Sequence, residues 1–420
     1  MDRWLGMIFG FKDVKFRNDD DFFDRLTRRH TCCLLLIMAL VITTHQYVGD
    51  PIHCWAPAQF TDAHKAYTNT ICWVKNTYYV PWEDEIPKPY ETHKRQMLSY
   101  YQWVPLILLC QAMLCYLPSI IWRAFSRRSG INIAAIMDSA IAGQRTSYAD
   151  IREKTVRYMV NQVDRYLMAR LERGRGCWSR IKNTAARYCC LVYGKFSGNY
   201  LTVGYMIVKL LYVVNAVGQL FMLDAFLGTD YHVYGFEVIR RFVTRDDWTR
   251  SERFPRVTLC DFLVRHQGHQ QHRYIVQCVL PINLFNEKIF IAIWFWFAIL
   301  CILSIVSFIK WSLNLSFWPA QVSYIKRSLR CAGIVRDKRE RDLVEKFSTR
   351  YLRRDGIFLL RLISNNVGHI VSYEVLAGLW DNFGPDHRLM NEKEQPELQP
   401  GGTATVAVRL NALADKLDNV

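Results

Sequence analysis

The chain has 420 residues, of which 51% are hydrophobic and 14% aromatic, and it carries a formal net charge of +16. Apolar runs without any charged residue argue against a soluble helical protein, because buried soluble helices rarely stay free of charge for about 18 residues. The basic composition alone would suit a nucleic-acid-binding protein, but no basic segment carries a nucleic-acid motif, so we expect no nucleic-acid partner.

Residues 1–30 form a short N-terminal arm before the first apolar run. Its first part is rich in apolar side chains, among them Trp4, Leu5, Met7 and Ile8. Its second part holds an acidic run made of Asp19, Asp20, Asp21 and Asp24. Such an arm can lie on the inner leaflet of a membrane or fold into a pore, and both placements fit these residues.

Four apolar runs have the length needed to cross a hydrocarbon core of about 30 Å at about 1.5 Å per residue. They are residues 31–48, 103–122, 201–223 and 289–309. The connecting and terminal segments are 49–102, 123–200, 224–288, 310–390 and 391–420. We therefore expect an all-α membrane protein with four transmembrane helices.

The distribution of charge predicts the orientation of these helices. Residues 123–200 carry 15 Lys and Arg against 5 Asp and Glu, whereas 49–102 carry 5 against 6 and 224–288 carry 9 against 8. Basic loops remain in the cytosol, so both termini should be cytosolic and the other two loops extracellular. The basic segments would then face anionic lipids of the inner leaflet.

Four cysteines form two matched pairs in the two extracellular loops. Cys54 and Cys72 are separated by 17 residues, as are Cys260 and Cys278. An oxidising exterior favours disulfides, so we expect a small disulfide-linked extracellular domain. Four cysteines allow three pairings, and the spacing alone leaves all three open.

Several residues interrupt the apolar spans. Pro105 and Pro118 in the second span are expected to bend it, because an interior proline removes a helix hydrogen bond. Lys209 in the third span should face a neighbouring helix, a polar cavity or the inner interface. His45 near the outer end of the first span suits either a water-lined path or an ordinary membrane interface.

Two segments on the cytosolic side have helical periodicity. Apolar residues recur at spacings of three and four in Asp150–Arg173 and in Leu343–Trp380. We expect these segments of the 123–200 and 310–390 regions to pack together as a helical cytosolic domain. The tail from residue 391 onward is polar, with several Pro and Gly residues, and should be mostly disordered.

The chain contains no catalytic motif, so we do not expect an enzyme, and we expect no cofactor or metal. The closest approach to a metal site is His266, His269 and His272, whose Gln-rich and Gly-containing context favours a solvated polar turn. The acidic run Glu83, Asp84 and Glu85 suits a solvated loop, with a cation-attracting pore mouth as the alternative.

Four segments in the correct order resemble the innexins, the invertebrate gap-junction proteins. Tyr100, Tyr101, Gln102, Trp103, Val104 and Pro105 match the family signature YYQWVP. Residues 49–55 and 254–262 resemble the starts of the two outer loops, and residues 278–288 resemble the approach to the fourth span. The resemblance covers residues from about 20 to 320.

The resemblance implies a subunit that forms an octameric ring with identical or related subunits in the plasma membrane. Two rings on adjacent cells would dock at a gap junction and pass ions and small metabolites. The arm and the first span would line the pore, which makes Trp4, Leu5, Met7, Ile8 and His45 pore-lining candidates. Pro105 becomes a candidate gating kink. The resemblance also favours disulfides between the loops, Cys54–Cys278 and Cys72–Cys260.

Two other functions remain as alternatives. One is a non-junctional hemichannel of the pannexin type, which has the same architecture. The other is a four-span adhesion or scaffold protein of the tetraspanin or claudin type. The long cytosolic loop and the helical C-terminal region argue against the adhesion protein, as does the lack of the Cys-Cys-Gly motif typical of tetraspanins.

Overall fold

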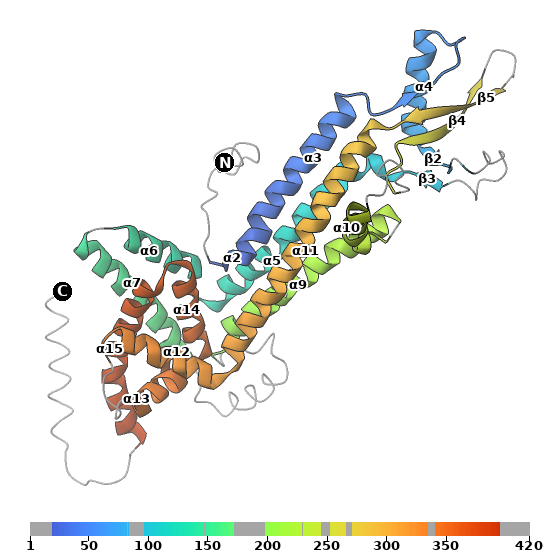
Figure 1. Ribbon diagram of the computed structural model, residues 1–420. Helices are drawn as coiled ribbons and strands as arrows, with labels where there is room; N and C mark the ends of the chain where they lie inside the picture. Colours follow the sequence, from blue (N-terminus) through green and yellow to red (C-terminus); the bar gives the residue numbers. More distant parts are fainter. Residues whose placement is uncertain are drawn as a thin grey trace, which may run out of the picture.

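The computed structural model describes residues 19–394, apart from 82, 84–95, 147, 172–197, 229, 245–252, 266–270 and 335–340. Four long helices form an elongated bundle, with a β-sheet at one end and a cluster of shorter helices at the other (Figure 1). The apolar arm residues Trp4, Leu5, Met7 and Ile8 lie outside the described residues, as does the tail from residue 395 onward.

The bundle contains the four predicted spans. Its first helix runs continuously through α2 (Phe22–Arg25), a π-helical segment (Leu26–Thr31) and α3 (Cys32–Tyr47). The others are α5 (Val104–Ser129), α9 (Tyr200–Leu227) and α11 (Pro281–Ser316). All four are long and apolar enough to cross a membrane, and each contains its predicted span to within one residue.

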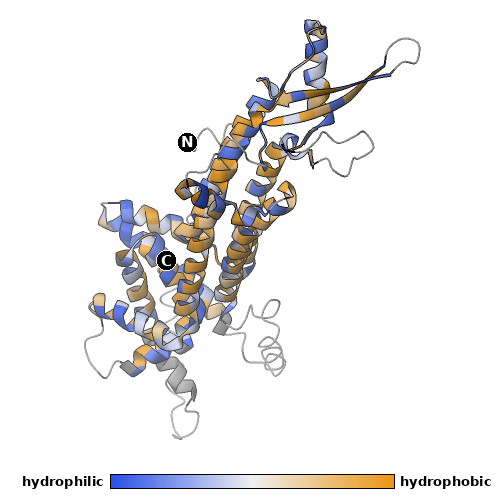
Figure 2. Ribbon diagram, turned by 45° about the vertical axis from the view of Figure 1, so that its right-hand side comes forward, coloured by the Kyte–Doolittle hydropathy of each residue, from blue (hydrophilic) through white to orange (hydrophobic). Residues whose placement is uncertain are grey.

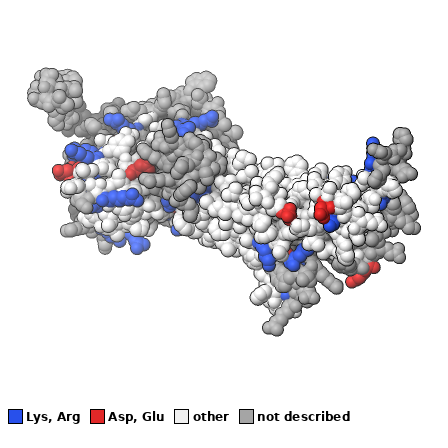
Figure 3. Space-filling view, turned by 90° about the horizontal axis from the view of Figure 1, so that it is seen from above, with Lys and Arg blue, Asp and Glu red and all other residues white. Residues whose placement is uncertain are grey.

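Many apolar side chains of the bundle point outward. Leu40, Met113, Val214 and Ile302 are each more than half exposed, and Figure 2 shows a continuous hydrophobic band along the bundle. A large exposed apolar surface is unfavourable in water and is typical of helices that contact lipid. Figure 3 shows basic side chains over the short-helix end and a mostly uncharged surface between the two ends.

The sheet has strands from both Cys-containing loops. The first loop supplies β1 (His53–Cys54), α4 (Asp62–Lys75), β2 (Thr77–Tyr79) and β3 (Gln96–Leu98). The second supplies β4 (Val257–Arg265) and β5 (Gln271–Val279). All pairs are antiparallel, in the order β1-β5-β4-β2-β3. We call α4 and these five strands the sheet domain.

The other end is a helical domain whose parts come from both halves of the chain, as the periodicity predicts. It comprises α6 (Ile133–Arg145), α7 (Ala149–Leu171), α12 (Trp318–Cys331), α13 (Arg341–Lys346), a π-helical segment (Phe347–Leu352), α14 (Arg353–Asn366) and α15 (His369–Glu394). Their apolar faces share one hydrophobic core with the adjacent ends of α5, α9 and α11.

The expected bend at Pro105 is wrong. Pro105 lies in the first turn of α5, where the backbone N–H has no partner within the helix and proline is favoured. Pro118 lies inside the same helix and is therefore the residue that removes an interior hydrogen bond.

Candidate functional site

Two disulfides join the two loops within the sheet domain. Cys54 is bonded to Cys278 and Cys72 to Cys260, which is the pairing that the resemblance implied. Cys54 and Cys278 lie directly opposite each other on the paired strands β1 and β5. The second disulfide ties the last turn of α4 to β4. Each bond therefore fixes a part of the first loop to the second.

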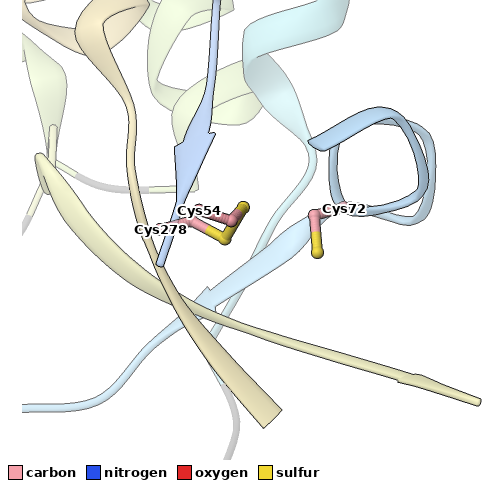
Figure 4. Close-up of side chains that lie close together, drawn as sticks. All are labelled: Cys54, Cys72 and Cys278. Carbon is pink, nitrogen blue, oxygen red and sulfur yellow. A yellow bond between two sulfur atoms is a disulfide. The ribbon is translucent and has the colours of Figure 1, made fainter. Parts of the chain in front are cut away.

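The two disulfides lie close together. The sulfur atoms of Cys54, Cys72 and Cys278 lie within 4.8 Å of one another (Figure 4). Metal ions bind cysteine as the thiolate, and all three sulfurs belong to disulfides. The cluster is therefore a pair of neighbouring disulfides in the domain interior, with Cys72, Cys260 and Cys278 fully buried.

Polar contacts strengthen the junction of the loops. The Asn69 side chain accepts a hydrogen bond from the Cys54 backbone N–H at 3.0 Å, and the Trp55 N–H donates to the Gln277 carbonyl at 2.8 Å. Lys75 Nζ at the end of α4 donates to the Asp261 carbonyl at 2.6 Å. These contacts hold the short strand β1 and the helix α4 against the long β4–β5 hairpin.

The YYQWVP signature lies at the junction of the sheet domain and the bundle. Tyr100–Gln102 form a 3-10 turn, Trp103 caps α5, and Val104 begins it. The Tyr100 hydroxyl lies 3.2 Å from both the Arg253 carbonyl and the Asn283 side chain. Burial raises the pKa of Tyr100, so its hydroxyl remains protonated and able to donate.

The rest of the signature connects further elements. Gln46 of α3 donates to the Tyr101 carbonyl at 2.6 Å, and Gln102 donates to the Trp73 carbonyl in α4 at 2.5 Å. The rings of Tyr101 and Trp73 lie 4.8 Å apart. The signature thus joins α3, α4, α5 and α11, and sequence reasoning identified its residues but not this junction.

His45 lies near the sheet-domain end of α3 and is exposed. Its ring stacks on that of Phe285 of α11 at a centroid distance of 3.9 Å. His272 lies on β5 opposite Val264, whereas His266 and His269 lie outside the described residues. Glu83 is in a turn, and Asp84 and Glu85 also lie outside.

At the opposite end of the bundle, residues 19–28 lead into α3 and form what we call the arm root. Asp19, Asp20, Asp24 and Arg28 are all buried here. The indole N–H of Trp122 donates to the Asp19 carbonyl at 3.2 Å, and Arg28 pairs with Asp20 at 3.2 Å. The acidic run is therefore packed among the helices of the bundle.

Lys209 of α9 is the main partner of the arm root. It is only 1% exposed, and its ammonium lies 2.9 Å from Asp24, 3.2 Å from Asp21 and 2.7 Å from the Ser307 hydroxyl. Of the three placements that the sequence left open for Lys209, the structure shows contacts with neighbouring helices. A buried ammonium needs opposite charge and hydrogen-bond acceptors to offset its desolvation, and the arm root supplies both.

Aromatic side chains complete this site. The Tyr205 hydroxyl donates to Asp24 at 3.2 Å, and the Trp311 indole donates to Asp21 at 3.0 Å. Although burial raises the pKa of Asp21, the charge of Lys209 and the hydrogen bond from Trp311 outweigh it, so the net pKa is lowered. Sequence reasoning missed these partners; the signals available were the acidic run before the first span and the polar Ser304 and Ser307 within the apolar fourth span.

Comparison with known proteins agrees with this architecture. The chain matches the innexin family model over residues 20–383. It is 36% identical over 374 residues to innexin unc-9 of Caenorhabditis elegans, covering 89% of this chain and 94% of that protein. It is 34% identical to both innexin-19 (395 residues; 88% and 85% covered) and innexin-3 (384 residues; 91% and 87% covered) of the same species. Innexins are gap-junction channel subunits rather than enzymes, and this chain belongs to the innexin family.

Proposed function

We propose that this gap-junction channel subunit forms an octameric ring with identical or related subunits and docks through its sheet domain with a ring on an adjacent cell. The observation that carries the docking proposal is the pair of disulfides that join both loops into one sheet domain at the end of the bundle. A surface that is rigid before binding loses less conformational entropy on docking. Ions and small metabolites would pass along the axis of the ring.

The same proposal places the sheet domain outside the cell and the helical domain with both termini in the cytosol. The net positive charge of residues 123–200 supports this orientation. The oxidising exterior is also where stable disulfides form. Membrane lipids would cover the remaining apolar surface of the bundle.

We further assign the pore entrance to the arm that precedes the arm root. The ion pairs of Lys209 fix the arm root, which directly follows residues 1–18 in the chain. A chain that is anchored at this point can project its apolar residues, including Trp4 and Ile8, toward the ring axis. His45 would contribute to the same path further along α3.

Two measurements test the proposal. Particle images of the purified oligomer should show eight subunits, and any other number would contradict the proposed ring. Deletion of residues 2–18, which leaves the arm root intact, should change single-channel conductance or voltage gating while rings still form. Unchanged currents from intact rings would exclude the arm from the pore.

A further inference from the structure

The short helix α10 (Tyr234–Thr244) lies beside the bundle near its sheet-domain end (Figure 1). Tyr234 and Gly235 are buried against the bundle. The same helix carries Phe236, Ile239 and Val243, which are 64%, 47% and 74% exposed. Spacings of three and four place these three side chains on one stripe of the helix, and we call them the α10 stripe.

Contacts with Trp294 set the position of α10 along the bundle. A Cβ on Gly235 would lie 2.0 Å from the Trp294 ring, so the backbone of α10 packs directly against this indole. The indole N–H also donates to the His232 carbonyl at 3.0 Å, in the 3-10 turn (Tyr231–Val233) that precedes α10. Trp294 lies five residues into the charge-free run 289–309 of α11. The helix α10 is therefore level with the first turns of a membrane span.

The polar side of α10 is basic. Glu237 pairs with Arg253 at 2.9 Å and with Arg241 at 3.5 Å, and Arg240 is exposed beside the α10 stripe. Tryptophan and arginine are frequent at the boundary between acyl chains and headgroups. Arginine is also well suited to bind the phosphate of a lipid headgroup.

We propose that α10 is an in-plane membrane helix whose stripe inserts between the acyl chains of phospholipids in the leaflet on the sheet-domain side. Arg240 faces the headgroup phosphates of the same lipids. Phospholipid is favoured as the occupant because Phe236 of the stripe packs edge to face on Trp294 of α11, at a ring-centroid distance of 5.3 Å, which places the stripe beside an apolar span. Phe221 of α9, itself 56% exposed, stacks against His232 just before α10. Amphipathic helices that lie in the interface have this combination of an apolar stripe and a basic polar face.

Photolabelling of the full-length protein in phosphatidylcholine nanodiscs tests the proposal. The lipids carry diazirines at two depths, one on the acyl chain close to the headgroup and one near the middle of the bilayer, and the labelled peptides are mapped by mass spectrometry. We expect carbene adducts on the α10 stripe at a yield similar to that on Ile302 of α11, which serves as the internal reference. Leu263, an exposed apolar residue of the sheet domain, should remain almost unlabelled.

A pair of variants sharpens the test. Ile239→Ser with Val243→Ser should reduce α10 adducts severalfold and leave those on Ile302 unchanged, whereas Leu263→Ser should change neither. Wild-type protein labelled on Ile302 but not on α10 would overturn the proposal, and this result is expected if a second copy of the chain covers the stripe. Unchanged α10 labelling in the serine variant would also overturn it.

Discussion

The structures at the two ends of the bundle are held together by different chemistry. The sheet domain is held by two disulfides that link residues 224 and 188 positions apart in the chain. The arm root is held by ion pairs and hydrogen bonds around Lys209. Disulfides keep a docking surface in one shape, whereas non-covalent contacts can open and close. The difference suits a rigid outer face and an arm whose position can change.

The largest effect on coupling between cells is expected when a disulfide of the sheet domain is removed. Cys72→Ser breaks the bond to β4 and should lower the stability of the domain by about 2–4 kcal/mol. Coupling between paired cells should then be lost even though the subunit reaches the surface, because the docking face loosens. Dye transfer combined with surface biotinylation measures both quantities.

A matched control is Cys331→Ser, which removes an exposed free cysteine of the helical domain. It should leave dye transfer unchanged. Wild-type coupling in the Cys72 variant would show that docking does not depend on this disulfide. Mass spectrometry of unreduced peptides checks the pairing itself.

Removal of Lys209 should disrupt the opposite end of the bundle. Lys209→Met leaves the buried carboxylate of Asp24 and the partly buried carboxylate of Asp21 without their cation, which costs about 3–5 kcal/mol. The melting temperature of the purified ring should fall, and voltage gating should change because the arm is no longer fixed. Lys310→Met, at an exposed position of α11, is the control and should have little effect.

A combination with the arm deletion separates structure from gating. In channels that lack residues 2–18, Lys209→Met should lower the melting temperature but cause no further change in gating. If Lys209→Met changes gating equally in channels with and without residues 2–18, Lys209 does not act on gating through the arm.

A smaller effect is expected at the signature junction. Asn283→Ala removes an acceptor of the Tyr100 hydroxyl and a donor to the Pro255 carbonyl, so the cost is about 1–3 kcal/mol. Thermal unfolding should show this loss, and coupling should decrease. Asn161→Ala, on an exposed position of α7, should change neither measurement.

The arm root should also show a pH dependence of its stability. Burial raises the pKa of Asp20 from 3.8 to about 7, against the opposing charge of Arg28. The folded protein therefore keeps a proton that the unfolded chain releases, and stability falls as pH rises from about 4 to about 7. Asp20→Asn should make the melting temperature less dependent on pH over this range, whereas Asp62→Asn on the exposed helix α4 should leave the pH dependence as in the wild type. A slope that persists in the Asp20 variant would contradict this assignment.

The smallest effect is expected at Pro105. Because it occupies the first turn of α5, Pro105→Ala should leave both stability and voltage gating close to wild type. Pro118→Ala adds an interior hydrogen bond and should change gating more. A larger effect at Pro105 in recordings of both variants would show that its role does not come from helix geometry.

The four spans, the need of Lys209 for a polar environment and the packing of the two helical segments could be predicted from the sequence alone. Each prediction depends on a local property: a charge-free run is long enough to cross a membrane, a lysine within it needs a partner, and apolar spacing marks a helix face. The match of residues 100–105 to the innexin signature likewise required only adjacent residues.

Only the tertiary structure decided which distant groups meet. The strands β1 and β2 pair with β5 and β4, about 200 residues away, and short strands give little local signal until a partner completes their hydrogen bonds. Lys209 could have paired with any acidic residue, and the packing of the arm root selected Asp21 and Asp24. Pro105 reads as an interior residue of an apolar run, but the start of α5 at Val104 makes it part of the first turn. The physical reason is the same for the strands, Lys209 and Pro105. Strand pairing, ion pairs and helix ends are set by contacts between segments that are distant in the sequence, and no local sequence pattern contains these contacts.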